Sequence, residues 1–307
     1  MPVSEILPDL FFIERGYLNG NHFAWVGERP VLIDSAYLPH IETTLEILAG
    51  IGIDAARTGQ ILTTHCHCDH IGGHRRIQAL SGCEIALHPI GRHFIATRDD
   101  WSTWWRYYDQ PAEFFEGTRS LQDGESVAVG PYRFTVIHTP GHSADGMVFY
   151  SPADRLLLSS DALWERDIPV MTLRVEGSRA LFDALHSLER IAALDVRRVC
   201  PGHGPAFEDL PAAVARSRER IRNYLDHPQD LGRDQLKRIF VYTVLMHPGL
   251  QADGFFERLM ATVWFPETCT FFFRGDFRRH YDDTMGGLLE RGVLTVRNGC
   301  LYTVVAP

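Results

Sequence analysis

The feature that most constrains this chain is a cluster of histidine and aspartate side chains placed directly after an apolar segment. Residues 60–64 read Gln-Ile-Leu-Thr-Thr, which is typical of a buried β-strand. In a loop that leaves this strand, His65 and His67 can converge on one metal ion. Asp69 and His70 can then turn toward a second ion. Imidazole and carboxylate groups bind zinc, iron and related ions, so the run predicts a metal site.

Two cysteines, Cys66 and Cys68, alternate with the histidines of this run. In an extended segment, successive side chains point to opposite faces. We therefore expect both thiols to lie outside the metal site, although thiolates are themselves metal ligands in other proteins. The alternative for the whole run is a polar loop that is rich in histidine by chance.

Three further polar residues follow strand-like segments later in the chain. They are His142, Asp161 and His203. Each stands where the end of a strand opens into a loop, which is the usual position of sites in α/β folds. Taken singly, each has an ordinary alternative, because an aspartate after a strand often caps a helix and a histidine often has a structural hydrogen-bond partner.

Taken together and in order, these motifs resemble those of the metallo-β-lactamase superfamily, over about residues 5–209. The resemblance implies the following ligands: His65, His67 and His142 for one metal ion, Asp69, His70 and His203 for the second, and Asp161 as a bridge between the two. It also implies an α/β fold, the αββα sandwich of this superfamily, with the site at one edge of two sheets. Two divalent metal ions are the expected cofactors, with zinc as the default and iron or manganese as alternatives.

The chemistry implied by this resemblance is hydrolysis. Two metals about 3.5–4 Å apart can lower the pKa of a shared water from about 15.7 toward 7. The metal-bound hydroxide would attack a carbonyl or phosphoryl centre, and Asp69 would be the catalytic residue that positions it and carries a proton. We therefore predict a dinuclear metal-dependent hydrolase of a small ester, thioester or lactone.

Details of the motifs narrow this prediction. Residues 64–73 and 138–142 resemble glyoxalase II, a thioester hydrolase. Residues 201–205 and the tail depart from glyoxalase II and are more similar to the branch of the superfamily that has a C-terminal winged helix. True β-lactamases generally lack the bridging aspartate that Asp161 supplies, which argues against β-lactam hydrolysis.

Two alternatives belong to other functional classes. The superfamily includes metal-dependent nucleases, so phosphodiester hydrolysis is the first alternative. The chain has 30 Lys and Arg against 39 Asp and Glu, a formal net charge of −9, which argues against a large basic surface for nucleic acid. The second alternative is a non-enzymatic regulatory protein that keeps the fold, against which the complete ligand set argues.

Two aromatic clusters are candidates for substrate contacts or for packing. The first lies within residues 101–108, where Trp104, Trp105 and Tyr108 are the candidate substrate-binding residues of a lid over the metals. The alternative is that these rings pack inside the domain, as buried aromatic residues usually do. The second cluster, at residues 264–273, could approach the pocket, pack the tail onto the main domain or form a homodimer interface.

The order of the expected strands and helices predicts that the chain has two domains. Strands are expected at residues 10–13, 22–26, 31–34, 60–64, 84–87, 132–137, 146–150, 155–160 and 196–200, and helices at 41–48 and 178–194. The tail should contain helices at 212–225, 235–246 and 282–291, followed by a hairpin at 293–304 with an Asn-Gly turn. We predict a catalytic domain at residues 1–209 and a mostly helical, winged-helix-like domain at 210–307.

The sequence also bears on location and partners. The N-terminal segment lacks the basic and apolar regions of a signal peptide, and no stretch approaches the roughly 20 apolar residues of a membrane span. The six cysteines do not resemble the disulfide framework of a small secreted domain. We expect a cytoplasmic protein that acts on a small-molecule substrate, without nucleic-acid or membrane partners.

Overall fold

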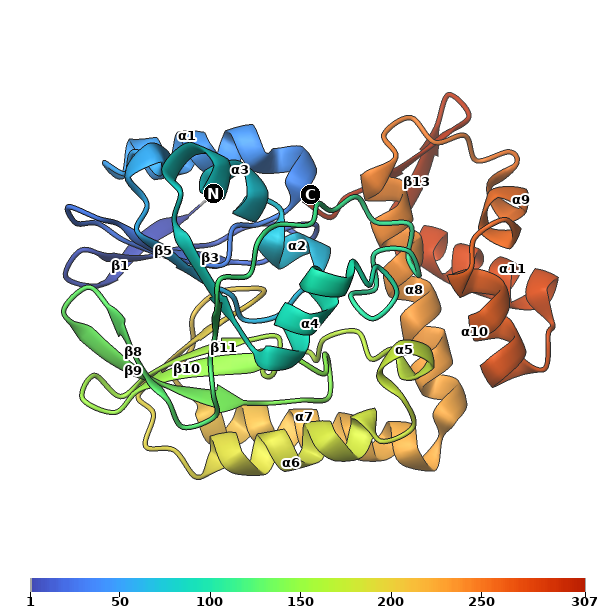
Figure 1. Ribbon diagram of the computed structural model, residues 1–307. Helices are drawn as coiled ribbons and strands as arrows, with labels where there is room; N and C mark the ends of the chain where they lie inside the picture. The colour runs from blue at the N-terminus through green and yellow to red at the C-terminus, as the bar shows by residue number, and fades with distance from the viewer. Residues whose placement is uncertain (1, 307) are drawn as a thin grey trace.

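Two large β-sheets packed face to face form the centre of the molecule, and helices cover the outer side of each (Figure 1). The computed structural model describes residues 2–306. The first sheet contains, in spatial order, β1 (Val3–Leu7), β2 (Leu10–Ile13), β3 (His22–Trp25), β4 (Val31–Ile33), β5 (Gln60–Leu62), β6 (Glu84–Leu87) and β7 (Arg119–Ser120). The second contains β12 (Arg198–Pro201), β11 (Leu156–Ser160), β10 (Met147–Ser151), β9 (Tyr132–His138) and β8 (Ser126–Val129). This arrangement confirms the predicted αββα sandwich.

The first sheet changes from antiparallel to parallel pairing at β4. Strands β1 to β4 pair antiparallel, and β4 to β7 pair parallel. Parallel neighbours need crossover connections, and these carry helices. The crossovers contain η1 (Leu38–His40), α1 (Ile41–Gly50), η2 (Ala55–Arg57), α2 (Cys68–Ile71), α3 (His74–Ser81) and α4 (Pro89–Thr97). In the second sheet, β11 and β12 are parallel and the other pairs are antiparallel.

Alternate side chains along the strands of the second sheet point into two different cores, one on each face of the sheet. In β10, Met147 and Phe149 enter the core between the sheets, where they meet residues of the first sheet such as Phe12. Val148 and Tyr150 point the other way, into the core under the outer helices. Because both faces of this strand are covered, it is apolar along its length rather than alternating with polar residues.

The outer layers follow from the same pattern. Helices α1 and α3 lie on the outer side of the first sheet, and α6 (Ala180–Ala192) and α7 (Leu210–Asp226) lie on the outer side of the second (Figure 1). Apolar residues of α6 such as Leu188 and Ile191 pack into the outer core of the second sheet, together with Ala213 of α7. Within residues 2–306, none of the helices combines the length and the apolar composition that a membrane span requires.

The C-terminal part continues the outer core of the second sheet. It contains α8 (Pro228–Met246), α9 (Phe255–Met260), α10 (Trp264–Phe273), α11 (Phe277–Glu290), β13 (Leu294–Arg297) and β14 (Cys300–Thr303). Phe240 of α8 and Trp264 of α10 are buried in the same cluster as Leu157 of β11. Most of the second aromatic cluster therefore packs inside the protein, whereas the side chain of Phe271 is 54% exposed.

The predicted hairpin near the C-terminus is present, with Asn298 and Gly299 in the left-handed conformation between β13 and β14. The winged-helix assignment and the boundary after residue 209 stay predictions. Helix α8 begins at Pro228, before the expected start at 235, and α3, α4, α9 and α10 are helices that the periodicity does not predict. Helix α10 shows no clear apolar stripe in the sequence, because the exposed Phe271 adds an apolar side chain to the face opposite its buried residues.

The core between the sheets yields a stability prediction. Replacing Phe149 by Ala should lower the free energy of unfolding by about 3–5 kcal/mol, because a fully buried ring leaves a cavity that the two sheets cannot close. Phe182→Ala on α6 is the control, since this side chain is 57% exposed and its loss should change stability by no more than about 0.5 kcal/mol. Denaturant unfolding measures both, and equal effects would contradict the described core.

Candidate metal centre

Loops from both sheets meet at one edge of the sandwich. From the first sheet comes the segment after β5, with His65 and His67. From the second come the loops after β9, β11 and β12, which carry His142, Asp161 and His203. The polar residues that the sequence places at strand ends are thus brought together by the packing of the two sheets.

The local conformation of the histidine run separates its two halves. His67 has extended backbone angles and stands at the N-cap of α2, which begins at the next residue. Asp69 and His70 lie within this short helix and are buried. The change from extended chain to helix sends His65 and His67 in one direction and the two residues of the helix in another.

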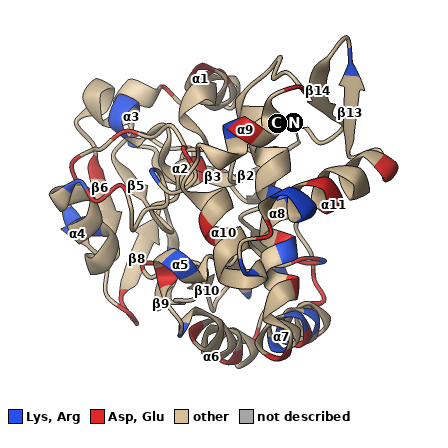
Figure 2. Cartoon of the chain, turned by 90° about the vertical axis from the view of Figure 1, so that its right-hand side faces the viewer, with Lys and Arg blue, Asp and Glu red and all other residues tan. Residues whose placement is uncertain are grey.

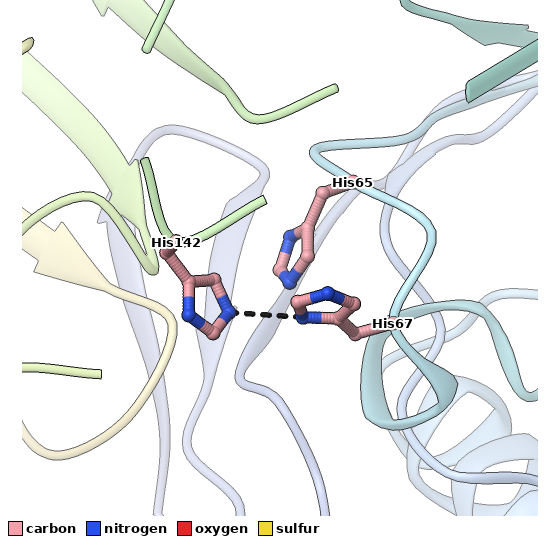
Figure 3. Close-up of side chains that lie close together, drawn as sticks. All are labelled: His65, His67 and His142. Atoms are coloured by element: carbon pink, nitrogen blue, oxygen red, sulfur yellow. Dashed lines mark hydrogen bonds between the residues drawn. The ribbon is translucent and has the colours of Figure 1, made fainter. Parts of the chain in front are cut away.

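Three imidazoles form the first group of potential ligands. Ring nitrogens of His65, His67 and His142 lie within 4.8 Å of one another, and all three residues are buried. Figure 3 shows the three rings converging, with His65 and His67 from one loop and His142 from the opposite sheet. The Nδ1 atom of His67 lies 2.9 Å from Nε2 of His142.

The second group contains two carboxylates and two imidazoles. It comprises Asp69, His70, Asp161 and His203. Nε2 of His203 lies 3.1 Å from Oδ2 of Asp69, and Nε2 of His70 lies 3.8 Å from the same oxygen. The mixture of imidazole and carboxylate donors suits zinc, iron or manganese.

Asp161 lies between the two groups. Its Oδ2 atom is 3.3 Å from Nε2 of His142, which belongs to the first group. The same oxygen is 3.6 Å from Nε2 of His70 and 3.9 Å from Nε2 of His203, in the second group. One carboxylate oxygen within 4 Å of imidazoles from both groups has the position that a bridging ligand requires.

A carboxylate that the sequence analysis did not single out, Asp34, orients both halves of the run. Nδ1–H of His70 donates to its Oδ2 at 2.8 Å, and the Thr64 hydroxyl donates to the same oxygen at 2.7 Å. The Thr64 hydroxyl is therefore left to accept from Nδ1–H of His65, at 3.1 Å. Asp34 thus holds His70 directly and His65 through Thr64, which leaves Nε2 of both rings free to face the site.

The other imidazoles are oriented in the same manner. Nδ1–H of His142 donates to the backbone carbonyl of Val170 at 2.8 Å, so its Nε2 is the atom left for a metal. The Ser160 hydroxyl donates to Thr64 and so joins the second sheet to the Asp34 network. Two nearby hydroxyls have other partners, since Thr63 contacts His74 and Ser143 contacts Asp145.

The residues present fit divalent cations. The Nε2 atoms of His65, His67 and His70 are buried and have no hydrogen-bond partner within residues 2–306. Burial lowers the pKa of His65 and of His67 well below the ordinary value, so both rings are neutral and keep a lone pair for a metal. Burial opposes ionisation of Asp161, yet neighbouring His70 and His203 hold its pKa well below the usual range. Neutral His65 and His67 and an ionised Asp161 are donors of the kind that a metal ion requires, whereas Asp69, Asp161 and Asp34 raise the pKa of His70, whose proton a bound metal ion would displace.

A glycine allows the carboxylate of Asp161 to take its position between the two groups of potential ligands. A Cβ atom on Gly202 would lie 2.0 Å from Oδ1 of Asp161, so only glycine is compatible with this approach of β12 to the site. The cysteines of the run lie outside both groups of ligands. Cys66 is buried beside Asp145, and burial raises the pKa of its thiol well above the ordinary value.

The fold and this geometry agree with the comparisons to known proteins. The profile described as "Metallo-beta-lactamase superfamily" matches residues 22–203, which is more than half of the chain. The chain belongs to this superfamily. A metallo-β-lactamase family protein from Thermus thermophilus superposes with a TM-score of 0.60 at 24% identity, covering 97% of this chain and 100% of that one. This likeness extends the shared fold beyond the matched residues, into the C-terminal part.

Two relatives are similar in sequence. A hydroxyacylglutathione hydrolase from Pseudomonas aeruginosa is 32% identical over a region that covers 52% of this chain and 52% of the relative. A human acyl-coenzyme A thioesterase is 27% identical, over 64% of this chain and 79% of the relative. The chain spans about half of the length of the hydroxyacylglutathione hydrolases that it matches.

In this chain, a cavity of about 580 Å³, part of it open to solvent, lies beside the candidate metal centre. Its lining contains Tyr17, His67, Asp69, Trp104, Tyr108, Gln110, His142, Asp161, Trp164, Val170, His203, Arg238, Ile239 and Tyr242. Most of these residues other than the potential ligands are aromatic or apolar, and α8 supplies three of them.

The three aromatic residues predicted to bind substrate have different positions. The Trp104 ring lies 3.9 Å from the His67 ring between centroids, and its Nε1 donates to Glu176 at 2.6 Å. Tyr108 also lines the cavity, and its hydroxyl contacts Thr172. Trp105 does not line the cavity. It is buried in the core between the first sheet and its outer helices, and its Nε1–H donates to the backbone carbonyl of Cys66. The segment is a series of turns, with Trp104 in the left-handed conformation.

Half of the residues that line the cavity were not predicted from the sequence, among them three polar residues with weak sequence signals. Tyr17 lies in a loop, and Arg238 and Tyr242 lie on α8, far along the chain from the metal motifs. Arg238 directly precedes the apolar run of residues 239–244, and a charge at the start of such a run is a signal that could have found this helix face. Asp34, which directly follows the apolar strand β4, is a similar signal for the orienting carboxylate.

The Asp34 network generates a prediction about metal affinity. Asp34→Asn should weaken metal binding by about 10- to 100-fold. In Asp34, one carboxylate oxygen accepts from the Thr64 hydroxyl and His70, and the other accepts from the Thr64 backbone N–H, whereas an amide has only one accepting oxygen. Titration of the metal-free protein with zinc measures the change. Asp226→Asn, at an exposed position, is the control. Equal zinc affinities for the Asp34 and Asp226 variants would show that Asp34 does not support the ligands.

The two groups of donors predict close to two metal ions per purified chain. His67→Ala should lower this content, because the first group would keep two imidazoles, and it should leave the fold largely intact. Elemental analysis with circular dichroism tests this, and His186→Ala, whose side chain is 69% exposed, is the control. Full metal content in the His67 variant would contradict its assignment as a ligand.

Proposed function

We propose that this chain is a metal-dependent hydrolase that cleaves acyl thioesters. The observation that carries this proposal is the position of Asp161 between two groups of metal-ligating side chains, at the base of a cavity with aromatic walls. Similarity to a relative that is an acyl-coenzyme A thioesterase, and to hydroxyacylglutathione hydrolases, supports thioesters as the substrate class. Esters and lactones present the same electrophilic carbonyl and are the neighbouring classes.

The ligand assignment is part of the proposal. One ion would be held by His65, His67 and His142, the second by Asp69, His70 and His203, and both by Asp161. Zinc is the default ion, with iron and manganese as alternatives. Divalent ions bound there would polarise the acyl oxygen and lower the pKa of a water molecule.

Asp69 is the catalytic residue in this proposal. Its carboxylate lines the cavity, and its Oδ2 is fixed 3.1 Å from Nε2 of His203. Burial opposes ionisation of this carboxyl, but His70 and His203 lower its pKa, so it is ionised at neutral pH. Asp69 would take a proton from the attacking water and pass it to the sulfur as the carbon–sulfur bond breaks, which yields a carboxylic acid and a thiol.

The cavity walls suit an apolar acyl group. Trp104, which packs on the His67 ring, and Ile239 of α8 present apolar surface beside the metal centre. Apolar walls bind an acyl chain and exclude bulk water from the reacting atoms. Residues 1–209 would therefore supply the metal ligands, and residues 210–307 would complete the substrate cavity through α8.

The nuclease alternative lacks support from the cavity. Among the described residues, Arg238 is the one Lys or Arg in its lining. This side chain pairs with Asp234 at 2.7 Å and with Asp167 at 2.8 Å, so its charge is balanced. On the face that Figure 2 shows, acidic and basic residues are interspersed. A phosphodiester backbone binds through uncompensated positive charge, which this cavity does not offer.

Turnover of a substrate panel tests the proposed function. Metal-loaded protein should release free thiol from acyl thioesters faster than it opens lactones or cleaves esters of the same acyl group, and RNA should remain intact. Asp161→Ala should lower the rate and the metal content together, because each ion loses a ligand. Absence of thioester turnover by protein carrying two metals would overturn the proposal.

The two tryptophans make a sharper prediction about acyl specificity. Trp104→Leu should raise KM for a long apolar acyl thioester about 5- to 100-fold relative to the acetyl thioester, because an aromatic contact with the chain is lost. Trp105→Leu is the matched variant, and it should lower Tm without changing the ratio of the two KM values. If Trp104→Leu impairs both substrates equally, this ring is not an acyl-binding wall.

A further inference from the structure

One short segment of the chain contacts both the candidate metal centre and the aromatic wall of the cavity. It comprises residues 170–176, in the connection between β11 and α6. The backbone carbonyl of Val170 accepts from Nδ1–H of His142 at 2.8 Å. The hydroxyl of Thr172 lies 2.7 Å from the hydroxyl of Tyr108, which lines the cavity. The segment therefore joins a proposed metal ligand to the cavity wall.

The last residue of this segment, Glu176, contacts the aromatic ring that stands beside the metal centre. Glu176 ends helix α5 (Leu173–Glu176), and its Oε1 accepts from Nε1–H of Trp104 at 2.6 Å. The Trp104 ring packs on two proposed ligands, with centroid distances of 3.9 Å to His67 and 5.0 Å to His142. The orientation of this ring decides how much room remains in the cavity beside the metal centre.

Trp104 depends on its surroundings for this position. Its backbone φ is 70°, in the left-handed region that a bulky residue rarely adopts, and such a conformation persists where other contacts fix it. The indole of the neighbouring Trp105 donates to the backbone carbonyl of Cys66, an acceptor that any residue at that position would offer. The acceptor for Trp104 is instead the side chain of Glu176, so a single substitution removes it.

The environment of Glu176 determines which residue can replace it. The residue is partly buried, and burial raises the pKa of its carboxyl to about 8, although the hydrogen bond from Trp104 lowers it. The carboxyl is therefore mostly neutral at pH 7, and a neutral carboxyl offers a carbonyl oxygen as acceptor. Gln offers the same carbonyl oxygen, whereas Met is of similar length and its thioether is only a weak acceptor.

We propose that Glu176 is a positioning residue that fixes the Trp104 ring against His67 and thereby selects the acyl group of the substrate. Glu176 is not part of the cavity lining, so it acts through Trp104 and does not touch the substrate. Without this hydrogen bond the ring is free to turn, and the apolar wall for the acyl chain is lost. The effect on acyl selection rests on the proposed thioester hydrolysis, whereas the effect on the ring does not.

Nuclear magnetic resonance of metal-loaded protein labelled with ¹⁵N at tryptophan tests the position of the ring. The indole N–H signal of Trp104 is identified by its absence in Trp104→Leu. In Glu176→Met this signal should move upfield and its proton should exchange faster with water, because the hydrogen bond is lost. In Glu176→Gln the signal should stay close to its wild-type position. An unchanged Trp104 signal in Glu176→Met would overturn the positioning role.

Steady-state kinetics tests the selection of the acyl group. Hexanoyl and acetyl thioesters of thiophenol differ only in the length of the acyl chain. Glu176→Met should raise the KM of the hexanoyl ester about 3- to 10-fold relative to the acetyl ester, the value of one hydrogen bond, with little change in kcat. Glu176→Gln should restore the wild-type ratio of the two KM values. Glu189→Met is the matched control, since the Glu189 side chain is 67% exposed on α6, and it should change neither KM.

A double variant shows whether Glu176 acts through Trp104. Adding Glu176→Met to Trp104→Leu should not raise the KM ratio further, because the carboxyl then has no ring to hold. A further increase in the double variant, or an unchanged ratio in Glu176→Met alone, would overturn the role in acyl selection. If the Trp104 signal moves as expected while metal-loaded wild-type protein cleaves no thioester, the positioning role stands and the proposed function fails.

Discussion

Burial of carboxylates and imidazoles at one edge of the two sheets is the constraint on which the rest of the structure depends. An isolated ionised carboxylate in an apolar interior is strongly unfavourable, so such groups need partners or metal ions. Here Asp34 is satisfied by Thr64 and His70, and this pairing turns the second nitrogen of each nearby imidazole toward the site. Asp161 accepts from Nε1–H of Trp164 and stands between two groups of ring nitrogens. The strand ends, the glycine at 202 and the short helix α2 all serve to hold these groups at this edge.

The C-terminal helices belong to the site as well as to the core. The superfamily profile matches residues 22–203, and this region contains all seven proposed ligands. Helix α8 lies outside this region and supplies part of the wall of the cavity beside the candidate metal centre. It is held there by apolar packing around Phe240 and by the pairing of Arg238 with Asp167, which lies in the loop after β11. The same ion pair therefore joins the part that supplies ligands to the part that supplies the cavity wall.

Much of the sandwich could be predicted because its strands have a clear local signal. The antiparallel β10 and β11, with four residues between them, lie within a residue of their expected positions. Helices α3 and α4 were missed because they have only 8 and 9 residues, too few for a helical period to be recognised in the sequence. The first aromatic segment shows a different limit. Trp104 and Trp105 are adjacent residues of the same type. Trp104 lines the cavity, whereas Trp105 packs in the core between the first sheet and its outer helices.

The sequence by itself determined the donor atoms of the candidate site and the order in which the chain presents them. It did so because metal ligation requires particular side chains at short spacings, and these remain visible in the run from His65 to His70 and at the later strand ends. Only the tertiary structure decided that Asp34 orients two of these donors, and that Tyr17, Arg238 and Tyr242 line the same cavity. Those relations join residues up to 225 positions apart, from Tyr17 to Tyr242, and they arise from the packing of two sheets and α8, which no local pattern encodes.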